Sequence, residues 1–119
     1  MMSYNNCPTV GIEDVKRLFP TLNERTNKGN MGRVLCVCGS ADERGISMCG
    51  AAYFAAMAAY RCGAGIVEMF TEKSNYAPLA ARAPEAVFAL YENGESRDSE
   101  KLVVSLSAWF NVVDRKSVV

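Results

Sequence analysis

The apolar positions along the chain predict helices and strands that alternate. Helices are expected in four segments, which carry apolar residues at helical spacing or a run of alanines: residues 11–20, 48–62, 75–83 and 99–110. Short apolar runs between them are expected to be strands: residues 33–38, 66–71, 86–91 and, as the beginning of a fourth, 111–113. Because strands alternate with helices over short connections, the pattern predicts βαβ units with right-handed crossovers and a parallel sheet.

The strand at residues 33–38 and the helix after it carry the clearest local signals. The run is apolar on both faces, as in a central parallel strand, and Gly39 and Ser40 close it. Ser47 is a candidate N-cap for the helix over 48–62, where small side chains allow close packing on a sheet. Gly63 stands where a left-handed residue commonly follows the end of a helix.

The end of the chain breaks this pattern. Three charged residues, Asp114, Arg115 and Lys116, follow residues 111–113 and do not fit a buried parallel strand. A sheet of three strands and a stub would expose a long apolar edge, so either another chain covers that edge or the sequence is incomplete. We expect incompleteness, with residues 1–10 as an N-terminal tail, 11–113 as the N-terminal part of a domain and 114–119 as a tail that need not belong to the fold.

Composition narrows the classes of function. The chain has 119 residues, with 13 Lys and Arg against 13 Asp and Glu, so its formal net charge is zero. Nucleic-acid binding relies on an excess of positive charge, and no nucleic-acid partner is therefore expected. No apolar run reaches the roughly 18–20 residues that a membrane helix needs, and the first residues do not form a secretory signal. We expect a soluble, cytoplasmic protein with no membrane partner.

Histidine is absent, and the five cysteines follow no disulfide framework. The lack of histidine excludes Ser-His and Cys-His nucleophiles and every zinc site that uses imidazole. Cys36 and Cys38 form a CxC pattern rather than CxxC, which argues against the usual zinc and thioredoxin motifs. We expect the cysteines to be small buried apolar residues in a reducing compartment, and we identify no metal ligands.

Candidate chemistry lies after the first strand. In an open parallel sheet, ligands bind beyond the carboxyl ends of the strands. The segment from Gly39-Ser40 to Gly50-Ala51 occupies that place, where glycine lets the backbone approach a ligand and helix amides suit an anion. The segment matches neither GxGxxG nor a Walker A motif, and spacing alone leaves a tight turn without a ligand as an alternative.

Four motifs, taken in order, resemble those of the NAD(P)H-hydrate dehydratase family. They are NKGNMGRVL at 27–35, CGS at 38–40, CGAA at 49–52 and AAYRCGAG at 58–65, and Pro84-Glu85 before the third strand also fits. The resemblance covers Gly11 to Val113. It implies a ribokinase-like α/β fold with three layers, a mostly parallel sheet flanked by helices, of which this chain is an incomplete N-terminal portion.

The resemblance also implies an activity. Members convert hydrated NADH or NADPH back to the reduced nucleotide at the expense of ADP or ATP, and Mg²⁺ usually offsets the charge that develops. Phosphorylation of the hydroxyl of the hydrate provides a far better leaving group than hydroxide. The nucleotide-binding segment and the catalytic aspartate of the family are expected beyond Val113. No catalytic residue is therefore expected within this chain, which by itself is expected to be inactive.

Site residues carry over position by position. Ala51 matches an alanine that contacts substrate at the helix start. Gly39, Ser40 and Gly50 are expected to bind substrate in the crevice beyond the carboxyl end of the first strand. Lys28 is also expected to bind substrate, from the loop before that strand, near the crevice. A solvated lysine in a turn fits Lys28 equally well. Glu68 and Glu85 are expected to be structural or solvent-facing.

Two other functions stay open. A sugar or vitamin kinase of the same superfamily would stop after phosphoryl transfer, although the Lys28-Gly29 and Gly50-Ala51 pairs favour the dehydratase. A non-catalytic βαβ module would complete its sheet by pairing with a partner chain. For the full-length dehydratase we expect a homo-oligomer, with the hydrate of NADH or NADPH as its substrate.

Overall fold

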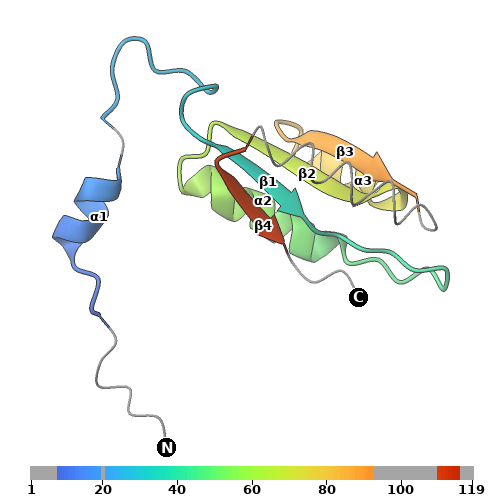
Figure 1. Cartoon of the computed structure of the whole chain (residues 1–119). Coiled ribbons are helices and arrows are strands. Elements are labelled where there is room, and N and C mark those ends of the chain that lie inside the picture. Colours follow the sequence, from blue (N-terminus) through green and yellow to red (C-terminus); the bar gives the residue numbers. More distant parts are fainter. Residues whose placement is uncertain (1–7, 20, 93–109, 116–119) are drawn as a thin grey trace, which may run out of the picture.

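The computed structural model describes residues 8–19, 21–92 and 110–115 (Figure 1). Its elements, in chain order, are α1 (Ile12–Leu18), β1 (Arg33–Val37), α2 (Cys49–Arg61), β2 (Ile66–Glu72), the 3₁₀ turn η2 (Lys73–Asn75), α3 (Tyr76–Arg82), β3 (Val87–Tyr91) and β4 (Val112–Arg115). All four expected strands and three of the four expected helices are therefore confirmed. The helix expected at 99–110 lies, apart from Phe110, outside the described residues.

The strands form one parallel sheet in the order β3-β2-β1-β4. β1 lies in its interior, and Leu35 pairs with Glu68 of β2 on one side and with Val113 of β4 on the other. The parallel sheet and the central position of residues 33–38 are as the apolar pattern predicts. Because every pair is parallel, the carboxyl ends of all four strands lie at one edge.

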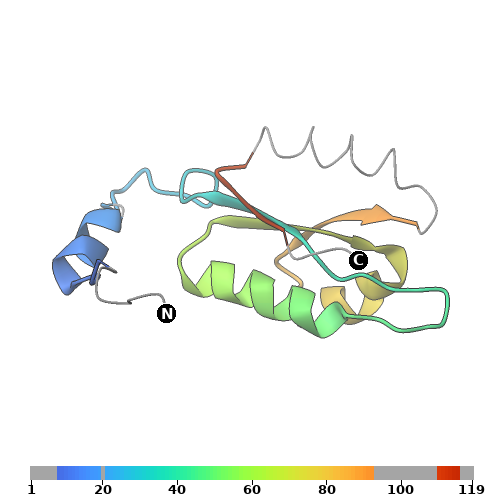
Figure 2. The same cartoon turned by 60° about the horizontal axis from the view of Figure 1, so that its bottom comes forward.

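Helices α2 and α3 cover one face of this sheet (Figure 2). Ala52 and Ala56 of α2 are fully buried there with Val67 and Met69 of β2, so small side chains bring the helix close to the sheet. The opposite face carries a second apolar cluster, made of Leu35, Val37 and Phe70 with Ala89, Tyr91 and Phe110. The second helical layer that the sequence predicts falls on residues outside the described part of the chain.

Two local predictions were wrong. Ser47 is not the N-cap of α2, because the helix begins after Met48 and the Ser47 hydroxyl donates to Asn75 Oδ1 instead. The fourth strand does not stop before the charged residues, since β4 includes Asp114 and Arg115. β4 lies at an edge of the described sheet, and an edge strand accepts charged residues that a central strand excludes.

Helix α1 forms where its apolar spacing predicts, yet it contributes no buried residue. Ile12 and Leu18 are 68% and 81% exposed. Local signals account for the helix, because Gly11 N–H donates to Asp14 Oδ2 at 3.0 Å and acidic residues occupy the first turn. Figure 1 shows α1 standing apart from the sheet on an extended connection.

The cysteines divide between the core and the surface. Cys36 and Cys38 are buried, as predicted, but Cys49 is only partly buried and Cys62 is exposed. The prediction is wrong for the latter two because they lie at the ends of α2 rather than in the central strand. Cys7 lies outside the described residues. Within the described ranges, no helix is long and apolar enough to span a bilayer.

Candidate functional site

A buried glycine turn follows β1 at the carboxyl edge of the sheet. Gly39 turns the chain with a φ of +81°, a left-handed conformation that side chains disfavour. A Cβ on Gly39 would lie 2.5 Å from Thr71 Oγ1 and 3.1 Å from the Cβ of Ala52. The first distance is too short for any side chain, so both backbone conformation and packing require glycine here.

Three donors hold the carbonyl oxygen of Gly39. Thr71 Oγ1 donates at 2.8 Å, the Glu72 N–H donates at 3.3 Å, and Asn75 Nδ2 is the third donor. Thr71 and Asn75 are completely buried. A buried polar group that loses its partner costs about 1–3 kcal/mol, so this network fixes the position of the turn.

The loop that leaves this turn is closed at its base. The Met48 N–H donates to the Ser40 carbonyl at 2.9 Å, and Ala41 and Ser47 form an antiparallel bridge. The Ser47 hydroxyl donates to Asn75 Oδ1, which attaches the end of the loop to the segment after β2. The chain therefore enters α2 beside the point where it left β1.

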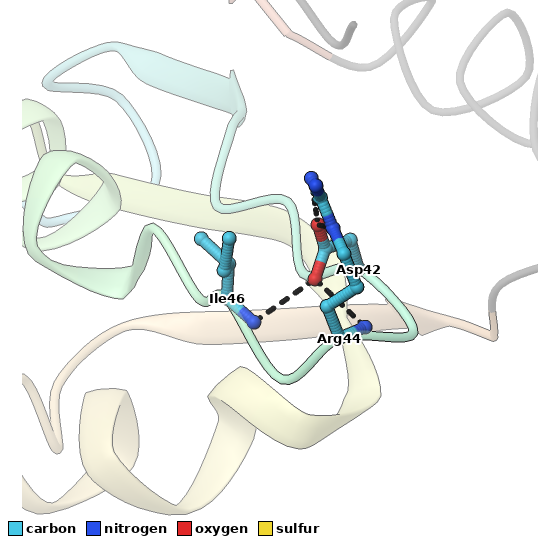
Figure 3. A network of polar contacts seen from close by, with 3 residues as sticks. All are labelled: Asp42, Arg44 and Ile46. Atoms are coloured by element: carbon cyan, nitrogen blue, oxygen red, sulfur yellow. Dashed lines mark hydrogen bonds and ion pairs between the residues drawn. The ribbon is translucent and has the colours of Figure 1, made fainter.

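Asp42 organises the exposed tip of the same loop (Figure 3). Its Oδ1 accepts hydrogen bonds from the Arg44 and Ile46 N–H groups, each at 3.0 Å, and its Oδ2 accepts one from Arg44 Nε at 2.9 Å. The Ile46 N–H and then the Arg44 side chain hold the pKa of Asp42 below its ordinary value of 3.8. Because the tip is exposed, the ion pair shapes the loop and adds little stability to the fold.

The first turn of α2 is open to an anionic ligand. Met48 provides no side-chain cap, and the first turn contains no acidic residue. A Cβ on the exposed Gly50 would meet no atom within 4 Å, so packing does not require glycine there. A helix start carries unpaired amides and partial positive charge, and a residue without a side chain lets a ligand approach them.

The structure brings together four of the five residues predicted to bind substrate. We call them the carboxyl-edge cluster: Gly39, Ser40, Gly50 and Ala51. The Met48–Ser40 hydrogen bond and the close approach of Gly39 to Ala52 place the two halves side by side. The cluster thus joins the end of β1 to the start of α2, as the sequence pattern predicts.

Lys28 is not part of this cluster. The prediction that it lies near the cluster is wrong, because its loop packs at the opposite edge of the sheet. A Cβ on Gly65, the residue before β2, would lie 1.9 Å from the Lys28 carbonyl oxygen. The Gly65 and Ile66 N–H groups also donate to the Gly32 carbonyl, at 3.0 and 3.2 Å. The loop before β1 therefore packs at the amino ends of the strands, at the edge opposite the cluster.

Thr71 and Asn75 are the site residues that the sequence analysis did not identify. Both lie at the carboxyl end of β2, Thr71 within the strand and Asn75 in η2. A usable signal exists, because the rule that indicates the segment after β1 applies equally to polar residues at the end of the neighbouring strand. That Thr71 and Asn75, among these polar residues, both reach the Gly39 carbonyl depends on the pairing of β1 with β2.

Charged residues continue along the same edge beyond β2 and β3. Lys73 Nζ and Glu92 Oε1 form an ion pair at 2.6 Å, and the bond to Lys73 lowers the pKa of Glu92 from its ordinary 4.5. Glu72 is 8% exposed and accepts a hydrogen bond from the Ser74 N–H at 2.7 Å. Burial, and then the charge of Glu72, raises the pKa of Tyr91 above 10.0. These contacts join the ends of the two strands.

The two carboxylates expected to lie outside the site do so. Glu85 is exposed in the turn before β3. Glu68 is half-buried in the middle of β2, on the face opposite α2, and burial raises its pKa above 4.5. The described residues contain no group of three or more His, Cys, Asp or Glu that could hold a metal ion, so none is assigned to Mg²⁺.

The chain is similar to known proteins over the region that contains this cluster. A family model described as NAD(P)H-hydrate dehydratase matches residues 34–113, which include the whole carboxyl-edge cluster. An ATP-dependent (S)-NAD(P)H-hydrate dehydratase from Ixodes scapularis is 43% identical over 70 residues, which are 59% of this chain and 22% of that protein. An ADP-dependent (S)-NAD(P)H-hydrate dehydratase from Listeria monocytogenes is 38% identical over 75 residues, 63% of this chain and 25% of that protein.

Solved structures give the same result for the fold. A ribokinase-like superfamily protein from Enterococcus faecalis superposes with a TM-score of 0.58 at 26% identity, over 78% of this chain and 29% of that one. An ADP/ATP-dependent NAD(P)H-hydrate dehydratase from Bacillus subtilis, co-crystallized with ATP/Mg²⁺, gives 0.58 at 26% identity, over 72% and 29%. The predicted ribokinase-like fold is confirmed. The chain spans about a quarter of the length of the curated relatives named above.

Proposed function

The chain belongs to the NAD(P)H-hydrate dehydratase family, and we propose that it supplies the substrate-binding edge of an enzyme that returns hydrated NADH or NADPH to the reduced nucleotide. The observation that carries the proposal is the match over residues 34–113, because it spans both the Gly39 turn and the start of α2. The reaction uses ADP or ATP as the phosphoryl donor.

The chemistry follows from the poor leaving ability of hydroxide. The terminal phosphoryl group of the nucleotide moves to the hydroxyl oxygen of the hydrate, which gives up its proton, and AMP or ADP departs. The carbon–oxygen bond then breaks, phosphate leaves with its electron pair, and a proton is lost from the neighbouring ring carbon. The ring double bond is restored, and the products are the reduced nucleotide, phosphate, and AMP or ADP.

The residues of this chain bind and orient the substrate in that reaction. Gly39 and Ser40 present backbone at the end of β1, and Gly50 and Ala51 present the first amides of α2, all without bulky side chains. Fixed amides of this kind stabilise an anion without having to reorganise. Mg²⁺ would offset charge on the transferring phosphoryl group. The described residues offer no ligand set for the metal.

Replacement of Gly50 by leucine tests the role of this edge. Gly50→Leu should weaken binding of NADPH hydrate at least tenfold, because the added side chain covers the helix start. The free energy of unfolding should stay the same or rise by about 0.5–1 kcal/mol, because leucine favours helix over glycine and a Cβ at Gly50 meets no atom within 4 Å. Calorimetric titration and urea unfolding measure the two quantities.

Ala58→Leu provides the matched control, since Ala58 is exposed on the same helix two turns further on. It should leave binding unchanged. Unmodified NADPH and ribose serve as competing ligands for the wild-type chain. If the chain bound a sugar or a vitamin in preference to the hydrate, the kinase alternative would replace the dehydratase.

A further inference from the structure

Asn75 contacts both sides of the loop that carries the carboxyl-edge cluster. Its Nδ2 donates to the Gly39 carbonyl, where the chain leaves β1, and its Oδ1 accepts from the Ser47 hydroxyl, just before α2. The side chain is fully buried, and its Nδ2 also lies 3.3 Å from Thr71 Oγ1. One amide therefore joins the exit from the strand to the approach to the helix.

Thr71 completes this arrangement. Its hydroxyl donates to the same Gly39 carbonyl at 2.8 Å, and the residue is fully buried. Neither side chain belongs to the loop it holds, because both come from the carboxyl end of β2 and the turn after it. The loop thus depends on groups from a different βα unit for its position.

We infer that Asn75 and Thr71 are positioning residues, which set the relative placement of Gly39-Ser40 and Gly50-Ala51 and thereby the affinity for the hydrated nucleotide. The inference rests on the proposed function for the identity of the ligand. Asn75 supplies both a donor and an acceptor, a combination that aspartate, alanine and leucine at this position do not offer. Ligand binding at this edge requires the two halves of the cluster to keep a fixed separation, since a small displacement of fixed amides weakens their contacts.

Two isosteric substitutions at buried positions test the inference. Thr71→Val keeps the volume of the side chain but removes its hydroxyl, and Asn75→Asp replaces the donor facing the Gly39 carbonyl by an acceptor. Each removes one of the three donors to the Gly39 carbonyl and should weaken binding of NADPH hydrate to the 119-residue chain about tenfold. Amide hydrogen exchange at Met48 and Glu72, whose N–H groups bond to Ser40 and Gly39, should accelerate about tenfold.

Thr71→Ser is the conservative variant that distinguishes positioning from packing. It retains the hydroxyl and loses only a methyl group, so binding and exchange should stay near wild type. If Thr71 acted by packing alone, Thr71→Ser would be the more damaging change and Thr71→Val the milder one. Leu79→Ala, at a buried site of α3 outside this network, controls for a general loss of stability. It should not accelerate exchange at Met48 selectively.

The outcomes separate the two proposals. Wild-type affinity and wild-type exchange at Met48 in both Asn75→Asp and Thr71→Val would overturn the positioning role and leave the proposed function intact. A wild-type chain that fails to bind the hydrate would overturn the proposed function, while the exchange rates at Met48 and Glu72 would still decide whether these residues hold the loop. If Asn75→Asp does not fold, the contrast between the two Thr71 variants decides.

Discussion

Gly39 and Gly63 are two left-handed glycines in different surroundings. Gly39 has a φ of +81° and a neighbouring hydroxyl 2.5 Å from where a Cβ would be. Gly63 ends α2 with a φ of +95°, but a Cβ there would meet nothing within 4 Å. The first position therefore combines backbone strain with steric exclusion, whereas the second has strain alone.

Alanine at each position should separate these two effects. Gly63→Ala should cost about 1 kcal/mol of unfolding free energy, the effect of placing a side chain in a left-handed conformation. Gly39→Ala should cost about 3 kcal/mol or more, because Thr71 must also move and its hydrogen bond is lost. Urea unfolding of the two variants gives the comparison, and equal costs would contradict the tight packing described around Gly39.

Among the elements, α2 joins the core to the carboxyl-edge cluster. Its sequence is apolar on nearly every side up to Arg61, so hydrophobic periodicity alone does not identify the face that packs on the sheet. Burial does: Ala52 and Ala56 are completely inaccessible, while Phe54 and Ala58 are exposed. Alanine at the buried positions sets how closely the helix lies on β1 and β2, and hence where its first turn lies.

A leucine at one of these positions should push the helix away from the sheet. Ala56→Leu adds three heavy atoms to a completely buried site and should lower the unfolding free energy by about 1–3 kcal/mol. Ala58→Leu adds the same atoms on the exposed face and should change it by less than about 0.5 kcal/mol. Chemical denaturation of both variants measures the difference. An equal effect would mean that the helix packs through another face.

For the whole molecule, equal numbers of acidic and basic residues make the pH dependence of stability a matter of individual carboxyl groups. Glu68 is half-buried on the sheet face opposite α2, and burial raises its pKa above the ordinary 4.5. Asp42 and Glu92 have lowered pKa values instead, because hydrogen bonds favour their charged forms. Their ion pairs with Arg44 and Lys73 lie at the surface, so their contribution to global stability is small.

Glu68 should make the chain less stable as pH rises just above 4.5. The folded state holds this proton more tightly than the unfolded state, so the stabilisation is complete below the unfolded pKa and is lost as pH rises through the folded one. Glu68→Gln removes the titration, so its stability relative to wild type should improve as pH rises above the ordinary 4.5 of the carboxyl group. Urea unfolding as a function of pH measures the effect, and a parallel pH profile for both proteins would contradict it.

The sequence analysis predicted the order of elements and the parallel sheet, because these depend on local apolar runs, glycines and short connections. The ribokinase-like fold was implied by the resemblance to the NAD(P)H-hydrate dehydratase family. The sequence analysis also placed Gly39, Ser40, Gly50 and Ala51 at one edge, since parallel strands place their carboxyl ends together. The four strand segments were predicted from their apolar runs, and the left-handed Gly63 from its place after the end of a helix. These features require only information carried by neighbouring residues.

The three-dimensional arrangement settled what depends on residues distant in the chain. Lys28 precedes β1 closely in sequence, but the packing of its loop on Gly65 puts it at the opposite edge of the sheet. Ser47 donates to Asn75, 28 residues away, instead of capping its own helix. Asp114 and Arg115 belong to β4, which lies at an edge of the sheet that the described residues form. In each case the outcome is set by pairing and packing between segments, which apolar periodicity and turn propensity do not encode.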